Sequence, residues 1–171
     1  MFRFFLTALT CVTLTATPIA VPVAAKDLGV PQAEVVLTVT NSDVTNADGV
    51  AVLDLAMLEQ LGRRSFETTT IWTDGAQRFD GVSLATLVDQ LGLHGAALRA
   101  TAINDYSVTI PLEDVSRDGA MIAYRMNGAP MSVRDKGPLW IVYPYDEDPR
   151  FQTEVIYSRS IWQLDRIEVI D

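Results

Sequence analysis

The chain has 171 residues, of which 49% are hydrophobic and 20% are charged, and its formal net charge is −9 at pH 7. A surface this acidic repels nucleic acid and anionic lipid, so we expect no nucleic-acid partner. The chain has a single histidine, His94, and a single cysteine, Cys11. Zinc, haem and iron–sulfur sites therefore have almost no ligands to draw on.

The first 25 residues have the layout of a cleavable secretory signal. Arg3 precedes an apolar, hydroxyl-rich run over residues 4–14, and small residues occupy positions 23–25. The threonines within this segment favour a cleaved signal over a retained membrane anchor, which needs a longer apolar run. We expect cleavage after Ala25, which removes Cys11 and leaves a single mature domain over residues 26–171.

The first predicted elements of the mature chain are a strand and a short helix. A β-branched run predicts a strand over residues 35–40, and the polar residues 41–49 predict a loop. Asp54 is a candidate N-cap, and the leucines at positions 55, 58 and 61 share one helical face. Gly62 follows where a left-handed cap is expected, so we predict a two-turn helix.

A hairpin and a second helix are predicted next. Alternation over residues 66–72 predicts a strand, and the turn at residues 73–75 joins it to a partner over residues 77–82. Ser83 is the candidate N-cap of a helix whose apolar face ends at Gly92. His94 lies just past that helix and is expected to be a solvated loop residue.

The rest of the chain is predicted to be mostly strands. Expected strands cover residues 98–103, 106–110, 120–126, 139–143 and 162–170, with a helical turn near Pro111 and turns at residues 104–105 and 127–128. The pattern contains no repeat and no internal linker. The fold class is therefore predicted to be mixed α+β, a single strand-rich domain.

Three familiar kinds of functional site find little support in the residues: a catalytic triad, a hard-cation site and a glycine-rich phosphate loop. A Ser-His-Asp triad would have to use His94, and no Gly-x-Ser-x-Gly segment exposes a serine. The acidic run at residues 146–148 suits either a hard cation such as calcium or, more commonly, a solvated loop. Neither common type of glycine-rich phosphate loop is present.

Cations and large rings concentrate between residues 134 and 162. They are Arg134, Lys136 and Arg159, with Trp140, Tyr143, Tyr145, Tyr157 and Trp162. Such rings stack on planar ligands, while cations and hydroxyls bind the polar edges of a heterocycle or an anion. The rival interpretation is a packed core strand with surface ion pairs, and composition alone favours it.

Three segments in this region carry a likeness to a known family: Asn-Gly-Ala-Pro at 127–130, Lys-Gly-Pro-Leu-Trp-Ile-Val-Tyr-Pro at 136–144, and Tyr-Ser-Arg-Ser-Ile-Trp-Gln-Leu at 157–164. With Gly-Val-Ser-Leu at 81–84, they resemble the molybdopterin-binding domain of the sulfite oxidase family. The resemblance extends over roughly residues 35–169. It implies that the whole mature chain adopts that fold, with the last of these segments in a terminal strand.

Departures from the family pattern affect the cofactor chemistry that the resemblance implies. In the family's enzymes a cysteine from a strand near residues 68–72 binds molybdenum, whereas this chain has Thr-Thr-Thr-Ile-Trp and no soft ligand. The resemblance places Trp140 where the family has a phosphate-binding arginine, and Lys136 where it has an asparagine or histidine. It thus implies a pterin-shaped pocket without oxygen-atom transfer, and we assign no catalytic residue and no metal ligand.

The chain is similar to a stand-alone branch of this family, small periplasmic proteins that bind a metal-free reduced pterin. Residues 72–75, 134–140 and 157–160 carry that similarity. The branch implies that the loaded protein docks on the outer domain of a membrane signalling protein, either a cyclic di-GMP enzyme or a sensor kinase. It implies pterin contacts by Thr70, Trp72, Arg134, Lys136, Trp140, Ser158, Arg159 and Ser160.

Two alternatives stay open. One is a molybdopterin-dependent oxidoreductase in which Thr70 or Asp74 replaces the cysteine, and the other is an interaction domain whose pocket is filled by side chains. Arg3 stands alone, without the twin-arginine mark of proteins exported already folded around a cofactor. We therefore expect the chain to cross the membrane unfolded and to acquire a pterin in the periplasm, which argues against the enzyme.

Overall fold

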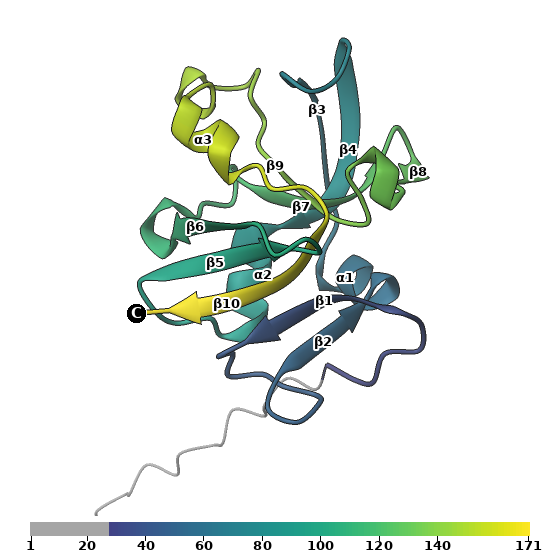
Figure 1. The fold of residues 1–171 in the computed structure, drawn as a ribbon, viewed down its shortest axis with the longest axis vertical. Helices are drawn as coiled ribbons and strands as arrows, with labels where there is room; N and C mark the ends of the chain where they lie inside the picture. The colour runs from purple at the N-terminus through teal and green to yellow at the C-terminus, as the bar shows by residue number, and fades with distance from the viewer. Residues whose placement is uncertain (1–27) are drawn as a thin grey trace, which may run out of the picture.

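The computed structural model describes residues 28–171 (Figure 1). The predicted signal, its cleavage site and Cys11 lie outside the described residues. Within residues 28–171, no helix has the length and apolar character needed to cross a bilayer.

Residues 28–171 form two five-stranded sheets. Figure 1 shows how the two sheets are arranged. The first has the order β2-β1-β10-β5-β6, with β1 at Val35–Thr40, β2 at Ala51–Asp54, β5 at Ala97–Ala102, β6 at Ser107–Pro111 and β10 at Leu164–Ile170. The pair β1–β10 is parallel and joins the two ends of the domain, while the other pairs in this sheet are antiparallel.

The second sheet has the order β3-β4-β7-β8, and β9 also pairs with β7. Its strands are β3 at Arg64–Thr69, β4 at Ala76–Ser83, β7 at Met121–Met126, β8 at Ala129–Pro130 and β9 at Trp140–Val142. One continuous core of buried side chains runs through both sheets. The predicted α+β class, a single strand-rich domain, is confirmed.

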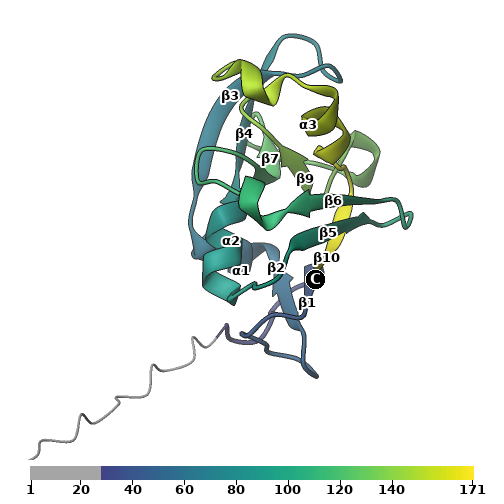
Figure 2. The same cartoon turned by 90° about the vertical axis from the view of Figure 1, so that its left-hand side faces the viewer.

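The described part of the chain also has three α-helices and three 3-10 turns: α1 at Leu55–Leu61, α2 at Leu84–Leu91, α3 at Glu154–Arg159, η1 at Leu112–Asp114, η2 at Val133–Asp135 and η3 at Pro149–Phe151. Helices α1 and α2 lie together and both contact β4. Helix α3 and the tip of the β3–β4 hairpin lie at the same end of the molecule (Figures 1 and 2).

Most helix boundaries follow the predicted caps. The Asp54 carboxylate accepts a hydrogen bond from the backbone N–H of Met57 at 2.9 Å, and Gly92 ends α2 in the left-handed region. Two details need correction. Gly62 ends α1 at φ 144° and ψ 137°, outside the left-handed helical region, and Ser83 makes no side-chain capping bond.

Three parts of the chain differ from the prediction. Strand β2 precedes α1 although only a loop and a helix were predicted there. The family-like segment at 157–164 is not one strand, because Thr153 caps helix α3 and β10 begins only at Leu164. Strand β3 ends at Thr69 rather than residue 72, since the chain turns away there into the hairpin loop.

Candidate functional site

The indole of Trp72 stands at the centre of a cluster of aromatic rings. Its ring centroid lies 5.9 Å from those of Trp140, Tyr157 and Trp162, and 6.3 Å from that of Tyr145. All four contacts have interplanar angles of 64° or more, so edges meet faces, an arrangement that aromatic pairs favour. Rings from four separate segments therefore converge on the loop between β3 and β4.

A local turn holds Trp72 in place. The hydroxyl of Thr70 accepts a hydrogen bond from the backbone N–H of Trp72 at 3.1 Å and lies 2.8 Å from the hydroxyl of Thr73. Hydroxyl-bearing residues commonly stabilise such turns by bonding to backbone groups two residues on. Thr70 thus orients the central ring of the cluster.

Asp146 anchors the base of the same loop. Its carboxylate accepts hydrogen bonds from the backbone N–H of Thr69 at 2.6 Å and from the hydroxyl of Thr69 at 2.7 Å. These bonds lower the pKa of Asp146, since they favour the charged form. The acidic run at 146–148 therefore supplies a hairpin anchor. Among residues 28–171, no three His, Cys, Asp or Glu side chains gather in a way that would hold a metal ion.

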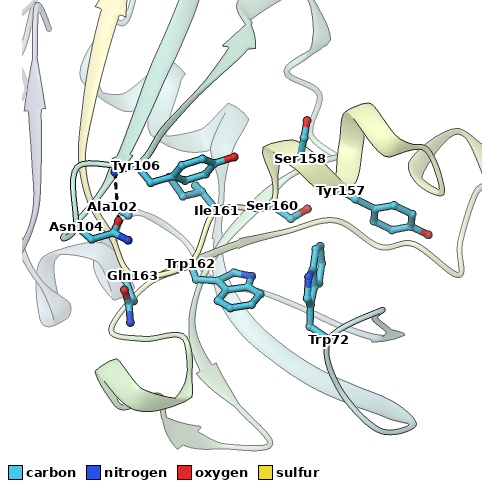
Figure 3. A pocket seen from close by; sticks show the side chains of 10 residues that line it. All are labelled: Trp72, Ala102, Asn104, Tyr106, Tyr157, Ser158, Ser160, Ile161, Trp162 and Gln163. Atoms are coloured by element: carbon cyan, nitrogen blue, oxygen red, sulfur yellow. Dashed lines mark hydrogen bonds between the residues drawn. The ribbon is translucent and has the colours of Figure 1, made fainter.

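A cavity of about 280 Å³ opens beside this cluster (Figure 3). Its ten lining residues are Trp72, Ala102, Asn104, Tyr106, Tyr157, Ser158, Ser160, Ile161, Trp162 and Gln163. They come from the β3–β4 loop, the β5–β6 hairpin, helix α3 and the segment between α3 and β10. Aromatic rings, hydroxyls and amides line the cavity, and none of the ten side chains is charged.

The polar groups on the deep side of the cavity are neutral and already ordered. The hydroxyl of Ser160, a residue only 4% exposed, lies 2.6 Å from the hydroxyl of Tyr145 and donates to the carbonyl of Ile156 at 2.9 Å. Burial raises the pKa of Tyr145, so its phenol stays protonated at physiological pH. The wall therefore presents uncharged hydrogen-bonding groups.

Comparison with known families identifies the domain. The family model described as the oxidoreductase molybdopterin binding domain matches residues 55–148. The chain belongs to this family. The search of the curated proteins returned no match. The matched region runs from α1 past the Asp146 anchor and contains Trp72 and Trp140.

Four of the predicted site residues of this molybdopterin-binding domain lie at the cavity or support it. Trp72, Ser158 and Ser160 line it directly, and Thr70 orients Trp72. Lys136 lies close by, because its ammonium nitrogen stands 5.1 Å from the ring centroid of Trp162 and 5.6 Å from that of Trp140. That charge is held against aromatic faces rather than in the cavity lining.

The other three predicted residues are placed differently. Trp140 has no exposed surface, since Trp72, Trp162 and Phe79 cover it, so the expected stacking of a ligand directly on Trp140 must be corrected. Arg159 forms an ion pair with Asp114 at 2.9 Å and lines a different cavity. Arg134 is exposed on η2 and does not line the cavity.

Several lining residues were not among the predicted contacts. Asn104 and Tyr106 were recognised only as parts of a turn and a strand, yet pairing of β5 with β10 carries their hairpin to the cavity. The backbone N–H of Tyr106 donates to the Asn104 side chain at 3.2 Å, as the dashed line in Figure 3 marks. Gln163 lies in the family-like segment at 157–164, but it was not a predicted contact. Tyr157 and Trp162 are among the aromatic rings concentrated between residues 134 and 162, but the sequence did not predict them as ligand contacts.

The cavity fits part of the family's cofactor. Ligand pockets usually measure roughly 300–1,000 Å³, so about 280 Å³ suits a small bicyclic ring better than a larger conjugate. A pterin ring needs stacking surfaces and neutral hydrogen-bonding edges, which the lining supplies. A phosphate group is bound best by cationic side chains, and none lines the cavity. Molybdenum is bound best by a thiolate, and residues 28–171 contain no cysteine. The residues fit the pterin ring, but not the phosphate or the metal.

Proposed function

We propose that this protein binds a reduced, metal-free pterin in the cavity beside Trp72 and works as a non-catalytic signalling component in the periplasm. The loaded protein would dock on the outer domain of a membrane-bound cyclic di-GMP enzyme or sensor kinase. The observation that supports pterin binding is the uncharged lining of the cavity, which combines aromatic rings with amide and hydroxyl groups.

The reachable ring in this proposal is that of Trp162. It is 39% exposed, whereas Trp140 is fully buried. A pterin stacked on Trp162 would have the hydroxyls of Tyr106, Tyr157 and Ser158 and the amide of Asn104 at the same cavity to meet its polar edge. Lys136, held over the Trp162 ring, adds positive charge near that face without entering the lining.

Calorimetry with tetrahydrobiopterin and reduced monapterin under anaerobic conditions tests the proposal. The wild-type protein is expected to bind at least one of them with micromolar affinity. Trp162→Leu is expected to weaken binding about tenfold, the amount that loss of an aromatic contact accounts for. Tyr143→Phe is the matched control, because Tyr143 lines a different cavity and its substitution should leave the affinity unchanged.

Two outcomes would favour the alternatives. Stoichiometric molybdenum in protein purified from its native compartment would support a molybdopterin-dependent oxidoreductase and overturn the metal-free pterin. Absence of any small molecule in native mass spectrometry, together with no pterin binding and retained binding of a membrane partner, would support a ligand-free interaction domain.

The export part has a separate test. The amino-terminal sequence of protein recovered from a periplasmic extract is expected to begin at Lys26, as the small residues before that position predict. An intact amino terminus on a membrane-associated protein would contradict cleavage.

A further inference from the structure

A second cavity of about 440 Å³ lies away from the aromatic cluster and has a different chemical character. Its lining residues are Glu59, Arg63, Asp80, Tyr124, Arg125 and Gly128. On β4, Phe79 packs against Trp140, and the next residue, Asp80, faces the opposite side, as neighbouring residues of a strand do. The second cavity and the aromatic cluster around Trp72 and Trp140 therefore lie on opposite faces of β4.

An irregularity in β7 builds this cavity. Asp80 pairs with Arg125, but Gly81 pairs with Ala123, so Tyr124 is an extra residue in the strand. Consecutive strand residues normally point to opposite faces, whereas Tyr124 and Arg125 both line the cavity. Bulges that redirect a side chain in this way are common next to binding sites.

The carboxylate of Asp80 is buried, and one of its oxygens, Oδ1, accepts three hydrogen bonds. The donors are the hydroxyl of Ser65, the guanidinium of Arg63 at 3.1 Å and the guanidinium of Arg78 at 3.4 Å. Burial opposes the ionisation of Asp80, but the bonds from Ser65 and Arg63 outweigh it and lower its pKa. Asp80 is thus a fixed anion that positions two arginines.

The groups of this cavity without a hydrogen-bond partner among residues 28–171 include several donors, beside Oδ2 of Asp80 and Oε2 of Glu59. The hydroxyl of Tyr124 is buried and has no hydrogen-bond partner among residues 28–171. Arg63 and Arg125 each use one terminal nitrogen, for Asp80 and Glu59 respectively, and their remaining N–H groups meet no acceptor in the described part of the chain. A buried polar group without a partner costs stability, so its retention requires an explanation.

The ion pairs around the cavity carry a small excess of positive charge. Two guanidinium groups, those of Arg63 and Arg125, and two carboxylates, those of Glu59 and Asp80, line the cavity and balance each other. The guanidinium of Arg78, outside the lining, also pairs with Asp80 and gives this ion-pair network one net positive charge in a chain whose total is −9. Guanidinium groups bind carboxylates through paired N–H donors.

We propose that this cavity is a binding site for a small carboxylate, with Arg63, Arg125 and the Tyr124 hydroxyl as its donors. One carboxylate carries one negative charge, which balances the local charge, and its two oxygens accept the unpaired N–H and O–H groups. The site is independent of the pterin cavity and does not rest on its assignment.

An NMR titration of the full mature chain with sodium acetate, at constant ionic strength set with sodium chloride, tests the site. Saturable shifts are expected at the backbone amides of Arg63, Tyr124, Arg125 and Gly128, with millimolar affinity. Inorganic phosphate is expected to bind more weakly because its charge exceeds the local balance. Tighter binding of phosphate, or no saturable shift with acetate at these amides, would overturn the proposal.

Tyr124→Phe separates a binding role from a structural one. Removing a hydroxyl that has no internal partner is expected to leave the melting temperature unchanged or higher, while acetate binding weakens about tenfold. Tyr106→Phe, which alters the aromatic cavity instead, is the matched control and should bind acetate normally. A lower melting temperature for Tyr124→Phe, or unchanged acetate affinity, would show that the hydroxyl serves the fold alone.

Discussion

Single side chains decide what the aromatic cavity offers a ligand, and Trp140 shows how burial changes a residue's role. It is the largest fully buried side chain, its indole packs perpendicular to Phe79 at 5.3 Å between centroids, and its N–H has no hydrogen-bond partner among residues 28–171. Trp140 therefore supports the rings that a ligand reaches rather than meeting the ligand itself.

We expect Trp140→Ala to destabilise the domain by about 3–5 kcal/mol, because it leaves a large cavity beneath Trp72 and Trp162. Trp140→Phe should cost less, since it keeps part of the packing and removes an unpaired N–H. Urea unfolding monitored by far-UV circular dichroism measures both. Equal stability of Trp140→Ala and the wild type would contradict the supporting role.

At the scale of elements, the β3–β4 hairpin depends on a contact from a distant loop. Asp146 holds the end of β3 through both the backbone and the hydroxyl of Thr69, and its own backbone N–H donates to the hydroxyl of Thr68 at 3.1 Å. Three residues further on, the same hairpin loop presents Trp72 to the cavity. Anchoring and ligand binding are therefore linked through one loop.

Asp146→Asn is expected to lower the melting temperature at pH 7 and to weaken pterin binding through disorder of the loop. Hydrogen bonds from Thr69 hold the folded-state pKa of Asp146 below the ordinary aspartate value of 3.8, so its ionised form stabilises the fold above that pH. This contribution is lost as the pH falls through the lowered pKa. Thermal melts from pH 7 to pH 2 should show the wild type and Asp146→Asn converging at the acidic end. A pH-independent difference would contradict the role of the charge.

At the scale of the whole molecule, the last strand ties the domain together. Strand β10 lies between β1 and β5, so it joins the first element of the domain to the β5–β6 hairpin that lines the cavity. The segment just before it supplies Ser160, Ile161, Trp162 and Gln163 to that cavity. The carboxyl-terminal quarter of the chain thus supplies the strand that joins β1 to β5 and also several residues that line the cavity.

Deleting residues 164–171 is expected to abolish folding, because the first sheet would lose its middle strand and expose the buried faces of β1 and β5. Loss of the cooperative thermal transition in circular dichroism would support this expectation. Deleting Asp171 alone, which is exposed and follows the strand, is the control and should leave the transition intact.

The sequence by itself determined the class and the elements whose signals are local. The caps at Asp54 and Gly92, the alternating strands and the Asn127-Gly128 turn, where both residues have positive φ, were readable because each depends on neighbours a few residues away. The family resemblance was readable for the same reason, since its motifs are continuous segments.

Tertiary structure alone decided which of those residues meet at the cavity. Helix α3 forms where a strand was expected, Trp140 is covered by rings from other segments, and Arg159 pairs with Asp114 rather than facing the cavity. Asn104 and Tyr106 reach it only because β5 pairs with β10. Burial and ion pairing depend on residues far apart in the chain, so no pattern within a segment specifies them.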